Sequence, residues 1–406
     1  MKILYVAPSI IGAAGNRDYA LSCKKYIEML SKGKVEMEFC LPEIKLSSFR
    51  DLNFLRKKIY ELNHSFDLIH AELSSTNFEE FWKIFFLSLK YRDKPIVITV
   101  HDTPFLCYNS FFPLFQEGPA LSLRKIVRKV FELTIGPIVE NLLLHNANVK
   151  TIVTLTQTGA QKLKKKCGNK TKVRHVPLQL FYKPGDRFEI GEDKNISSNS
   201  SKEILILFFG YFRQSKGIEI LIDAYKKLIN VDQSLQQKSR LVLCGGFSET
   251  DEYYKMIRKK IADLPVNANV DIRGFVSNDD LFDIFKRAYC AILPYQTKET
   301  FSASGPLVRA LGAGCPVVVS DISTFTEIVK NGYNGLLFRE NDADDLCAKL
   351  RALIGDNVLR NTLSINCSEY LKNGHSGHQV AQKIINIYED ALNMEMNTGE
   401  KKNSSN

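Results

Sequence analysis

Short apolar segments alternate with amphipathic segments along almost the whole chain, and this alternation limits the possible folds more than any other feature. Apolar runs such as Ile3–Ala7 and Ile96–Val100 have the length and composition of buried strands. Segments with helical periodicity, such as Tyr19–Leu30 and Asn77–Tyr91, lie between these strands. Strands that alternate with helices predict mostly parallel sheets with helices on both faces. We therefore expect an α/β protein.

One polar segment rich in turn-forming residues interrupts the alternation, at 181–202 (FYKPGDRFEIGEDKNISSNSSK). This composition predicts a linker. The alternation restarts at Ile204–Phe209, and 406 residues suffice for two domains of about 150 residues each. The sequence thus predicts two doubly wound, Rossmann-like domains that face each other across a cleft. The expected boundaries are 1–180 and 203–376 for the domains, 377–393 for a final helix that crosses back to the first domain, and 394–406 for a disordered tail.

Hydropathy and cysteine usage favour a cytoplasmic protein. No apolar stretch approaches the roughly 18 residues that a membrane-spanning helix needs. The first residues, MKILYVAPS, have the pattern of a buried strand and too short an apolar run for a signal peptide. The nine cysteines are scattered, odd in number and without a CxxC motif, which predicts free thiols in a reducing compartment.

The chain carries a net charge of +10, and its basic clusters lie in the first half. They occur at Arg56–Lys58, within 124–129 and at Lys162–Lys166. The segment from Leu123 to Leu144 is amphipathic and basic at one end, a pattern suited to an anionic membrane surface. An ordinary solvated surface explains the same charges. Nucleic acid is disfavoured as a partner because no motif of the common nucleic-acid-binding folds is present.

The segment 294–320, PYQTKETFSASGPLVRALGAGCPVVVS, has the pattern of a strand end, a Ser/Gly-rich turn, a helix and a second buried strand. The helix is expected to start near Ser304 or Gly305, with Pro306 in its first turn and with Ser302 and Ser304 available as caps. Free N–H groups and the positive end of the helix dipole make such a start an anion site. The segment predicts a grip on phosphate or diphosphate, although a simple capped turn has the same pattern.

A second turn of the same kind strengthens the phosphate hypothesis. GYFRQSKG, at Gly210–Gly217, follows one predicted strand and precedes a helical pattern. Gly210 lets a ligand approach the backbone, and Arg213 and Lys216 place two cations near the same sheet edge. An exposed turn with solvated charges remains the alternative for this segment alone.

With these segments in view, the chain resembles the GT-B glycosyltransferases of family 4, which are retaining enzymes that use nucleotide sugars. The resemblance covers about Ile204–Leu353, through FFGYFRQSKGIEILIDAYKKL, LVLCGGFSE, NVDIRGFVSNDDLFDIFKRAYCAILPY and GPLVRALGAGCPVVVSDISTFTEIVKNGYNGLLF in the order that the family has. The first half is similar more loosely, through GAAGNRDYA, ITVHD and IVTLTQTGAQKL. The family's architecture implies a donor nucleotide on the second domain and an acceptor on the first.

The resemblance also assigns roles to single residues. It implies that Arg213 and Lys216 neutralise the donor diphosphate and stabilise charge on the leaving nucleotide. It places His101, at the end of the ITVHD strand, near the donor sugar, although a satisfied strand-end histidine is the alternative. The remaining matches are a loop packed on the base, formed by Gly274, Phe275 and Val276, and a first-domain turn near diphosphate or acceptor, formed by Gly12 and Gly15.

The chain departs from the family at a pair of glutamates that most members carry eight residues apart. Alignment on Gly314 and Pro316 puts Phe301 and Arg309 at these two positions. The second glutamate usually bonds the ribose hydroxyls, whereas a guanidinium cannot accept a hydrogen bond. Arg309 is expected to reach a phosphate or the ribose instead, and Glu299 is a neighbouring substitute for the first glutamate.

The sequence and the resemblance together predict a retaining glycosyltransferase that moves a hexose-type sugar to a glycan or lipid-linked glycan, in bacterial surface polysaccharide synthesis. No cofactor and no metal are expected, because Asp279–Asp280 begins a predicted helix and no other carboxylate pair is suitably placed. Peripheral contact with the inner membrane face is part of this expectation. Two alternatives stay open: a catalytically silent GT-B subunit that binds a partner or glycan, and a nucleotide-sugar epimerase on the same architecture.

Overall fold

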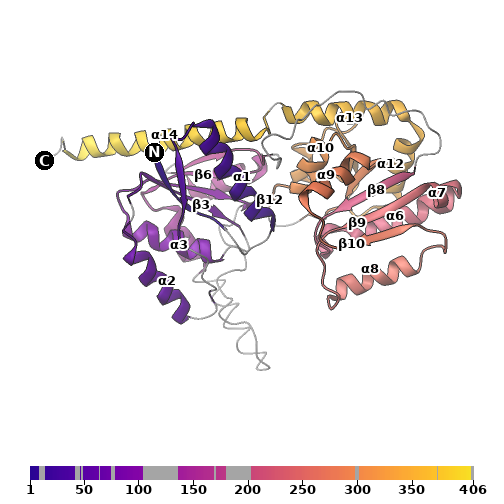
Figure 1. The fold of residues 1–406 in the computed structure, drawn as a ribbon, viewed down its shortest axis with the longest axis horizontal. Coiled ribbons are helices and arrows are strands. Elements are labelled where there is room, and N and C mark those ends of the chain that lie inside the picture. Colours follow the sequence, from indigo (N-terminus) through magenta and orange to yellow (C-terminus); the bar gives the residue numbers. More distant parts are fainter. Residues whose placement is uncertain are drawn as a thin grey trace. The chain divides into compact units, whose positions relative to one another are not determined.

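The computed structural model forms two units, and each has its own parallel sheet (Figure 1). The first unit contains Met1–Phe181, Thr300–Ala303 and Ser376–Asn406, and the second contains Tyr182–Glu299 and Ser304–His375. The residues that the structure describes are 1–8, 14–41, 46, 49–63, 65–74, 78–103, 136–168, 171–179, 203–297, 301–372 and 374–403.

The sheet of the first unit has six strands in the order β2-β1-β3-β4-β6-β7, and all neighbouring strands pair in parallel. The two central strands are buried along their whole length, as strands covered on both faces of a parallel sheet usually are. The strand bounds are β1 (Lys2–Val6), β2 (Glu36–Phe39), β3 (Leu68–Leu73), β4 (Ile96–Val100), β6 (Val149–Thr154) and β7 (Lys172–His175).

The helices of this unit include α1 (Ala14–Leu30), α2 (Phe49–Glu61), α3 (Phe78–Lys90), α5 (Gln157–Cys167) and α14 (Gly377–Asn403). Local sequence explains where α5 begins and ends. The Thr156 hydroxyl accepts a hydrogen bond from the N–H of Gly159, which caps the first turn. Gly168 follows the last turn with a φ of 62°, a conformation that favours glycine.

The C-terminal helix α14 belongs to the first unit, where it packs against α1 and lies next to β4 and β6. The Tyr388 hydroxyl lies 2.6 Å from Nδ1 of the buried His70 on β3, so a polar contact anchors the helix to the sheet. The helix continues to Asn403, whereas the sequence predicted an end at 393 and a disordered tail. Once a helix is anchored, each further residue adds a hydrogen bond without a new nucleation cost, and the tail contains good helix formers such as Glu and Lys.

A short antiparallel pair brings distant parts of the sequence together in the first unit. β5 (Asp102–Thr103) directly follows His101, and it pairs with β12 (Phe301–Ser302). The Ser302 hydroxyl also donates a hydrogen bond to the Asp102 carboxylate. These contacts place Thr300–Ala303 in the first unit, whereas the sequence assigned them to the second domain.

The second unit contains the other six-stranded parallel sheet, in the order β10-β9-β8-β11-β13-β14. The order doubles back between β10 and β11, so that β8 and β11 are neighbours although two strands separate them in sequence. The bounds are β8 (Ile204–Phe209), β9 (Ser239–Cys244), β10 (Val270–Arg273), β11 (Cys290–Leu293), β13 (Val317–Ser320) and β14 (Leu336–Phe338).

The helices of the second unit form two packed groups (Figure 1). α6 contacts α8 and α12, and α10 contacts α9 and α13. A connection that reverses direction along a sheet puts its helices on the opposite face, which produces the doubly wound arrangement. The bounds are α6 (Ile218–Val231), α7 (Ser234–Lys238), α8 (Glu252–Ala262), α9 (Asn278–Arg287), α10 (Gly305–Gly312), α11 (Ser323–Thr326), α12 (Ala343–Gly355) and α13 (Asn357–Lys372).

The predicted α/β architecture with two parallel sheets is therefore confirmed. Within the described residues, the cysteines are all free and buried, as the sequence predicted. In the same part of the chain, no helix combines the length and the apolar character that crossing a membrane requires.

Gly377, the first residue of α14, offers a test of how this helix docks on α1. A Cβ atom at Gly377 would lie 2.4 Å from the ring of Tyr26, which is itself buried. Gly377→Ala is expected to lower the free energy of unfolding by about 1–3 kcal/mol, the usual cost of overpacking. The control is Gly355→Ala, because a Cβ there meets open space. Equal urea midpoints for both variants would show that α14 does not dock as described.

Candidate functional site

The loop after β8 packs directly against the segment after β11 in the second unit. Gly217 adopts the left-handed conformation with a φ of 61°, and a Cβ atom there would lie 1.9 Å from the carbonyl oxygen of Pro294. Gly210 has a φ of 155°, and a Cβ atom there would lie 3.4 Å from the Tyr295 hydroxyl. Only glycine allows this approach at Gly217. The sequence predicted that Gly210 lets a ligand approach, and in the structure both glycines lie where the two loops meet.

Hydrogen bonds join the same two loops. The backbone N–H of Gln296 donates to the carbonyl oxygen of Ser215 over 3.1 Å. The Gln296 side chain donates to the Glu219 carboxylate over 3.3 Å, and Glu219 also accepts a hydrogen bond from the Tyr253 hydroxyl. The loop that carries Arg213 and Lys216 is therefore fixed at both its turn and its following helix.

The two cations of this loop differ in their surroundings. Lys216 is half-buried, and its Nζ lies 3.5 Å from the centre of the Tyr295 ring, within the range of a cation–π contact. Arg213 is exposed, and its guanidinium carbon lies 5.3 Å from the centre of the Tyr211 ring. Lys216 is thus positioned by an aromatic ring beside the sheet edge, whereas Arg213 retains access to solvent.

Tyr295 is a member of this site that the sequence did not reveal. It is 8% exposed, and burial raises the pKa of its hydroxyl well above the usual value, a shift that the neighbouring Ser304 opposes. The hydroxyl therefore stays protonated at neutral pH and can donate. Within the described residues, the Tyr295 hydroxyl has no hydrogen-bond partner. Its position two residues after the apolar run of β11, where a ligand site was expected, is the signal that could have identified it.

The helix start predicted at 304–306 is confirmed by α10. The Ser304 hydroxyl accepts a hydrogen bond from the Leu307 N–H over 3.3 Å, and Pro306 occupies the first turn. Ser304 lies beside Tyr295, so the helix start belongs to the same group of residues as Lys216. Ser302 does not share this cap, since it lies in β12 of the first unit and bonds Asp102.

Arg309 lies within the second unit, on the side of α10 that faces the end of β8. Its guanidinium carbon is 5.9 Å from the centre of the Phe209 ring, and both side chains are half-buried. Phe209 is the last residue of β8 and directly precedes Gly210. The side chain therefore lies near the Phe209 ring at the end of β8.

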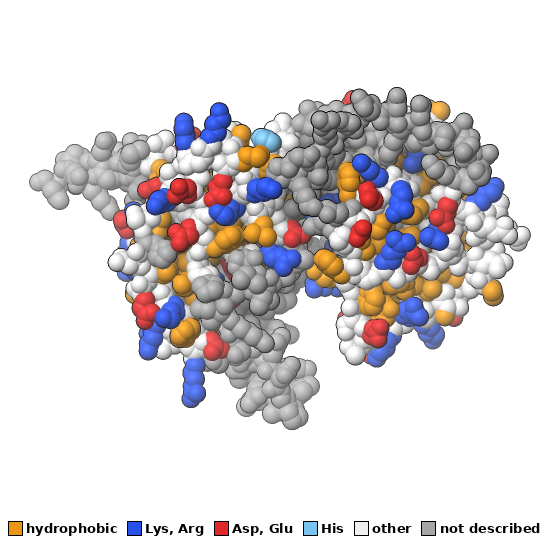
Figure 2. Space-filling model, viewed as in Figure 1, with side chains coloured by type: hydrophobic (Ala, Val, Ile, Leu, Met, Phe, Trp, Pro, Cys, Tyr) orange, Lys and Arg blue, Asp and Glu red, His pale blue; other side chains and the backbone are white. Residues whose placement is uncertain are grey.

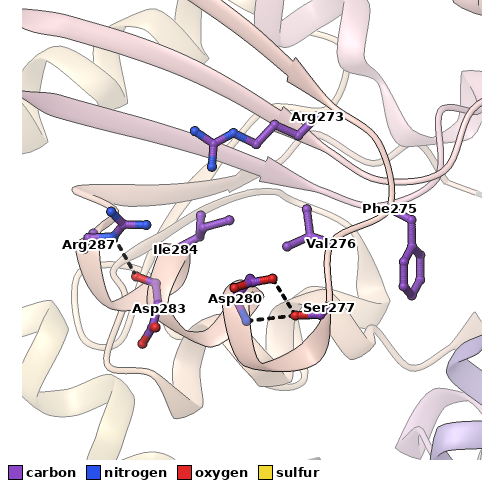
Figure 3. Close-up of a pocket in the computed structure, with 8 residues that line it drawn as sticks. All are labelled: Arg273, Phe275, Val276, Ser277, Asp280, Asp283, Ile284 and Arg287. Carbon is purple, nitrogen blue, oxygen red and sulfur yellow. Dashed lines mark hydrogen bonds between the residues drawn. The ribbon is translucent and has the colours of Figure 1, made fainter.

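The loop after β10 borders a pocket of about 380 Å³ (Figure 3). Phe275 and Val276, which were expected near the base, line it together with one face of α9, whereas Gly274 is not among its lining residues. Phe275 is 77% exposed and points away from the other side chains in Figure 3. The lining residues are Arg273, Phe275, Val276, Ser277, Asp280, Asp283, Ile284 and Arg287.

The first unit contains the other predicted catalytic residue, His101, at the end of β4. Its Nε2 lies 2.9 Å from Oε2 of Glu72 on β3, and its ring meets the edge of Tyr19 at 4.9 Å between centroids. Glu72 is fully buried and was not predicted. The signal lay in the apolar strand LIHAEL, where two polar residues two positions apart point to the same face.

The other predicted residues are not brought into these two groups. Gly15 lies in α1 with open space around it. Phe301, at the first glutamate position of the family, is in β12 of the first unit. Gly12 and Glu299 lie outside the described residues. A search of the described part of the chain finds no group of three His, Cys, Asp or Glu side chains that could hold a metal ion.

Comparisons with known proteins agree with this architecture. The family model of group 1 glycosyl transferases matches residues 189–399, more than half of the chain. The chain is 16% identical to sucrose-phosphate synthase from Thermosynechococcus elongatus, with a TM-score of 0.67 over 97% of this chain and 99% of that one. It is 17% identical to Anabaena HepE, which was solved with UDP-glucose, with a TM-score of 0.65 over 96% and 100% of the two chains.

Curated relatives match a shorter stretch. An uncharacterised glycosyltransferase of Methanocaldococcus jannaschii is 28% identical over 192 residues, which are 47% of this chain and 46% of the relative. A D-inositol 3-phosphate glycosyltransferase of Catenulispora acidiphila is 25% identical over 218 residues, 53% and 50% of the two chains. The matches thus span about half the length of these relatives. With the GT-B fold and the family match together, the chain belongs to the group 1 glycosyl transferases.

Proposed function

We propose that this protein is a retaining glycosyltransferase that takes a sugar from a nucleotide diphosphate sugar. The observation that carries the proposal is the group formed by Lys216, Tyr295 and the start of α10. A cation, a protonated hydroxyl and a helix N-terminus meet at the end of two neighbouring parallel strands, and each favours an anionic oxygen. HepE, which shares the fold, binds UDP-glucose, and this supports a diphosphate as the anion.

In this proposal, residues of the second unit stabilise the negative charge that forms during transfer. Breaking the bond between the sugar and the diphosphate leaves negative charge on the leaving phosphate. Lys216 and Arg213 neutralise this charge. The Gly305 N–H at the start of α10 donates to it, since Pro306 has no N–H and the Leu307 N–H is bonded to Ser304. Ser304 and Gly305 keep that helix start in place. His101 of the first unit serves the donor sugar, as the resemblance to the family suggests.

Arg309 adapts the site where the family has a glutamate. The guanidinium extends towards the end of β8, next to Gly210, and it offers only hydrogen-bond donors. We assign it to a donor phosphate or to a ribose oxygen that accepts. Glu299, Phe275 and Val276 complete the proposed donor contacts on the sugar and base sides.

The acceptor side of the proposal is a glycan or a lipid-linked glycan in bacterial surface polysaccharide synthesis. Helix α2 of the first unit supports a membrane-associated acceptor. It exposes Phe54 (50%) and Tyr60 (52%) beside the exposed Arg56 and Lys57. Aromatic and basic side chains on one amphipathic helix suit the interface of an anionic bilayer. On the face shown in Figure 2, basic and acidic side chains are intermixed.

The departure from the glutamate pair favours one alternative, a catalytically silent subunit that binds donor or glycan without transfer. Hydrolysis of the donor in the absence of acceptor separates an enzyme from such a subunit. Analysis of the released sugar then separates transfer from epimerisation. Donor hydrolysis that depends on Arg213 and Lys216 is the result that supports our proposal.

The lysine contact can be measured without any acceptor. UDP, GDP and ADP are first titrated against the full chain by calorimetry to find the nucleotide that binds. Lys216→Ala is expected to weaken that binding by about tenfold to a hundredfold, since a charge-assisted contact contributes about 1.5–3 kcal/mol. Lys259→Ala, at an exposed position of α8, is the matched control and should bind as the parent does. Unchanged affinity in Lys216→Ala would remove Lys216 from the site.

Arg309→Glu restores the residue that the family usually has. If Arg309 contacts phosphate, the new negative charge should lower nucleotide affinity about tenfold or more, which corresponds to at least ~1.4 kcal/mol. Arg258→Glu, on an exposed face of α8, makes the same charge change away from the site and serves as control. Higher affinity or faster donor hydrolysis in Arg309→Glu would instead mean that the position retains the family's ribose contact.

Membrane contact through α2 predicts a composition-dependent binding to vesicles. The double variant Phe54→Ser, Tyr60→Ser should sediment less with vesicles that contain phosphatidylglycerol, because it buries less apolar area at the interface. The control pair is Val358→Ser, Ile365→Ser, which removes two exposed apolar side chains from α13. Equal sedimentation of all three proteins would exclude α2 as the contact surface.

A further inference from the structure

A buried carboxylate lies in the sheet of the first unit, next to the predicted catalytic histidine. Glu72 is on β3, and its side chain is 0% exposed. Oε1 accepts a hydrogen bond from the Tyr5 hydroxyl over 2.9 Å, and Oε2 lies 2.9 Å from Nε2 of His101. Each carboxylate oxygen therefore has its own hydrogen-bonding neighbour, and the two neighbours come from different strand ends.

The protonation of Tyr5 and His101 determines which of them can donate a hydrogen bond to the Glu72 carboxylate. Burial, and after it the Glu72 carboxylate, raises the pKa of Tyr5, so the phenol stays protonated and donates to Oε1. A buried carboxylate is costly unless donors or a positive charge compensate it. The contact at Oε2 supplies this compensation only if Nε2 of His101 carries a hydrogen.

His70, the second histidine of the cluster, has a structural role. Nδ1 of His70 lies 2.6 Å from the Tyr388 hydroxyl and Nε2 lies 2.8 Å from the Thr99 hydroxyl, so both of its nitrogens have protein partners. Burial lowers the pKa of His70 below its usual value, with the Glu72 carboxylate opposing the shift. His70 thus joins α14 to the sheet as a neutral ring, and the working histidine of the pair is His101.

The His101 ring is held from several sides. Its backbone N–H donates to the Leu73 carbonyl oxygen over 2.8 Å, Tyr19 packs against the ring at 88° between planes, and Glu72 takes Nε2. The side chain is 9% exposed. With Nε2 committed to the carboxylate, Nδ1 is the nitrogen that remains to act on a ligand, as an acceptor in the neutral ring and as a donor in the imidazolium.

We propose that Glu72 is a positioning residue for the transfer reaction: it fixes the orientation of the His101 ring and keeps the hydrogen on Nε2, so that Nδ1 serves the donor sugar. The inference rests on the proposed function, because it needs His101 to take part in the reaction. Glu72 itself contacts no substrate in this scheme and acts through the imidazole.

The position of the hydrogen can be observed directly. In the full chain labelled with ¹⁵N-histidine, long-range proton–nitrogen correlation spectra distinguish the two neutral tautomers and the imidazolium, and His101→Gln identifies the His101 signals. We expect the parent to carry a hydrogen on Nε2 of His101. The variant Tyr5→Phe leaves the contact at Oε2 in place and should give the same spectrum for His101. A parent spectrum with the hydrogen on Nδ1 alone overturns the proposal, whatever the variants do.

Glu72→Gln keeps the shape and removes the charge, and its effect is measured as donor hydrolysis. We expect kcat to fall by about a hundredfold, within the range for a positioned acid–base group, while the donor KM stays within about twofold. The kcat of His101→Ala should fall at least as far. Adding Glu72→Gln to His101→Ala should lower kcat no further, because the effects of residues that act as a unit are not additive. A full additional loss in the double variant would make Glu72 a structural residue and overturn the proposal.

The outcomes separate this inference from the proposed function. If the parent hydrolyses no donor, the proposed function fails, and the positioning role fails with it. If the parent hydrolyses donor and His101→Ala does so equally well, the proposed function stands and the positioning role is overturned. Thermal midpoints of all variants show which ones fold. The parent spectrum decides the position of the hydrogen even if Glu72→Gln does not fold.

Discussion

The parallel pairing of β8 with β11 is the interaction on which the donor-side geometry depends. It places Phe209 and Leu293 side by side at the C-terminal ends of two neighbouring strands, so the loops that follow these residues lie close together. Gly217 lets these loops touch at Pro294, and the Gln296 N–H bonds Ser215 across the contact. Lys216 then lies on the Tyr295 ring as a consequence of backbone packing.

The first unit also has a six-stranded parallel sheet, and this sheet contains a buried polar cluster. Tyr5 of β1, Glu72 of β3 and His101 after β4 form a chain of hydrogen-bonding contacts in the buried interior of this unit. A polar cluster at such a position must be satisfied almost completely, because buried groups without partners are costly. Tyr388 of α14 extends the cluster through His70, so the last helix and the interior of the sheet are joined by one polar network.

The resemblance to the family aligns two residues of this chain, Phe301 and Arg309, with a pair of glutamates. Arg309 takes the second position and lies against Phe209, where a guanidinium can donate but not accept. Phe301 takes the first position within β12, and its neighbour Ser302 bonds Asp102 in the first unit. The segment that carries the pair in relatives is here divided between a short strand and a helix.

The sequence by itself determined most of the longer strands and helices and the start of α10, because these follow from local periodicity and from Ser304 and Pro306. It also predicted Arg213, Lys216 and His101 as site residues, through strand ends and family resemblance. Tertiary structure alone decided that Tyr295 supports Lys216, that Glu72 holds His101, and that Ser302 belongs with Asp102. β5 and β12 have two residues each, too few to leave a periodic signal. These contacts join residues far apart in the chain, and only the strand order brings such residues together.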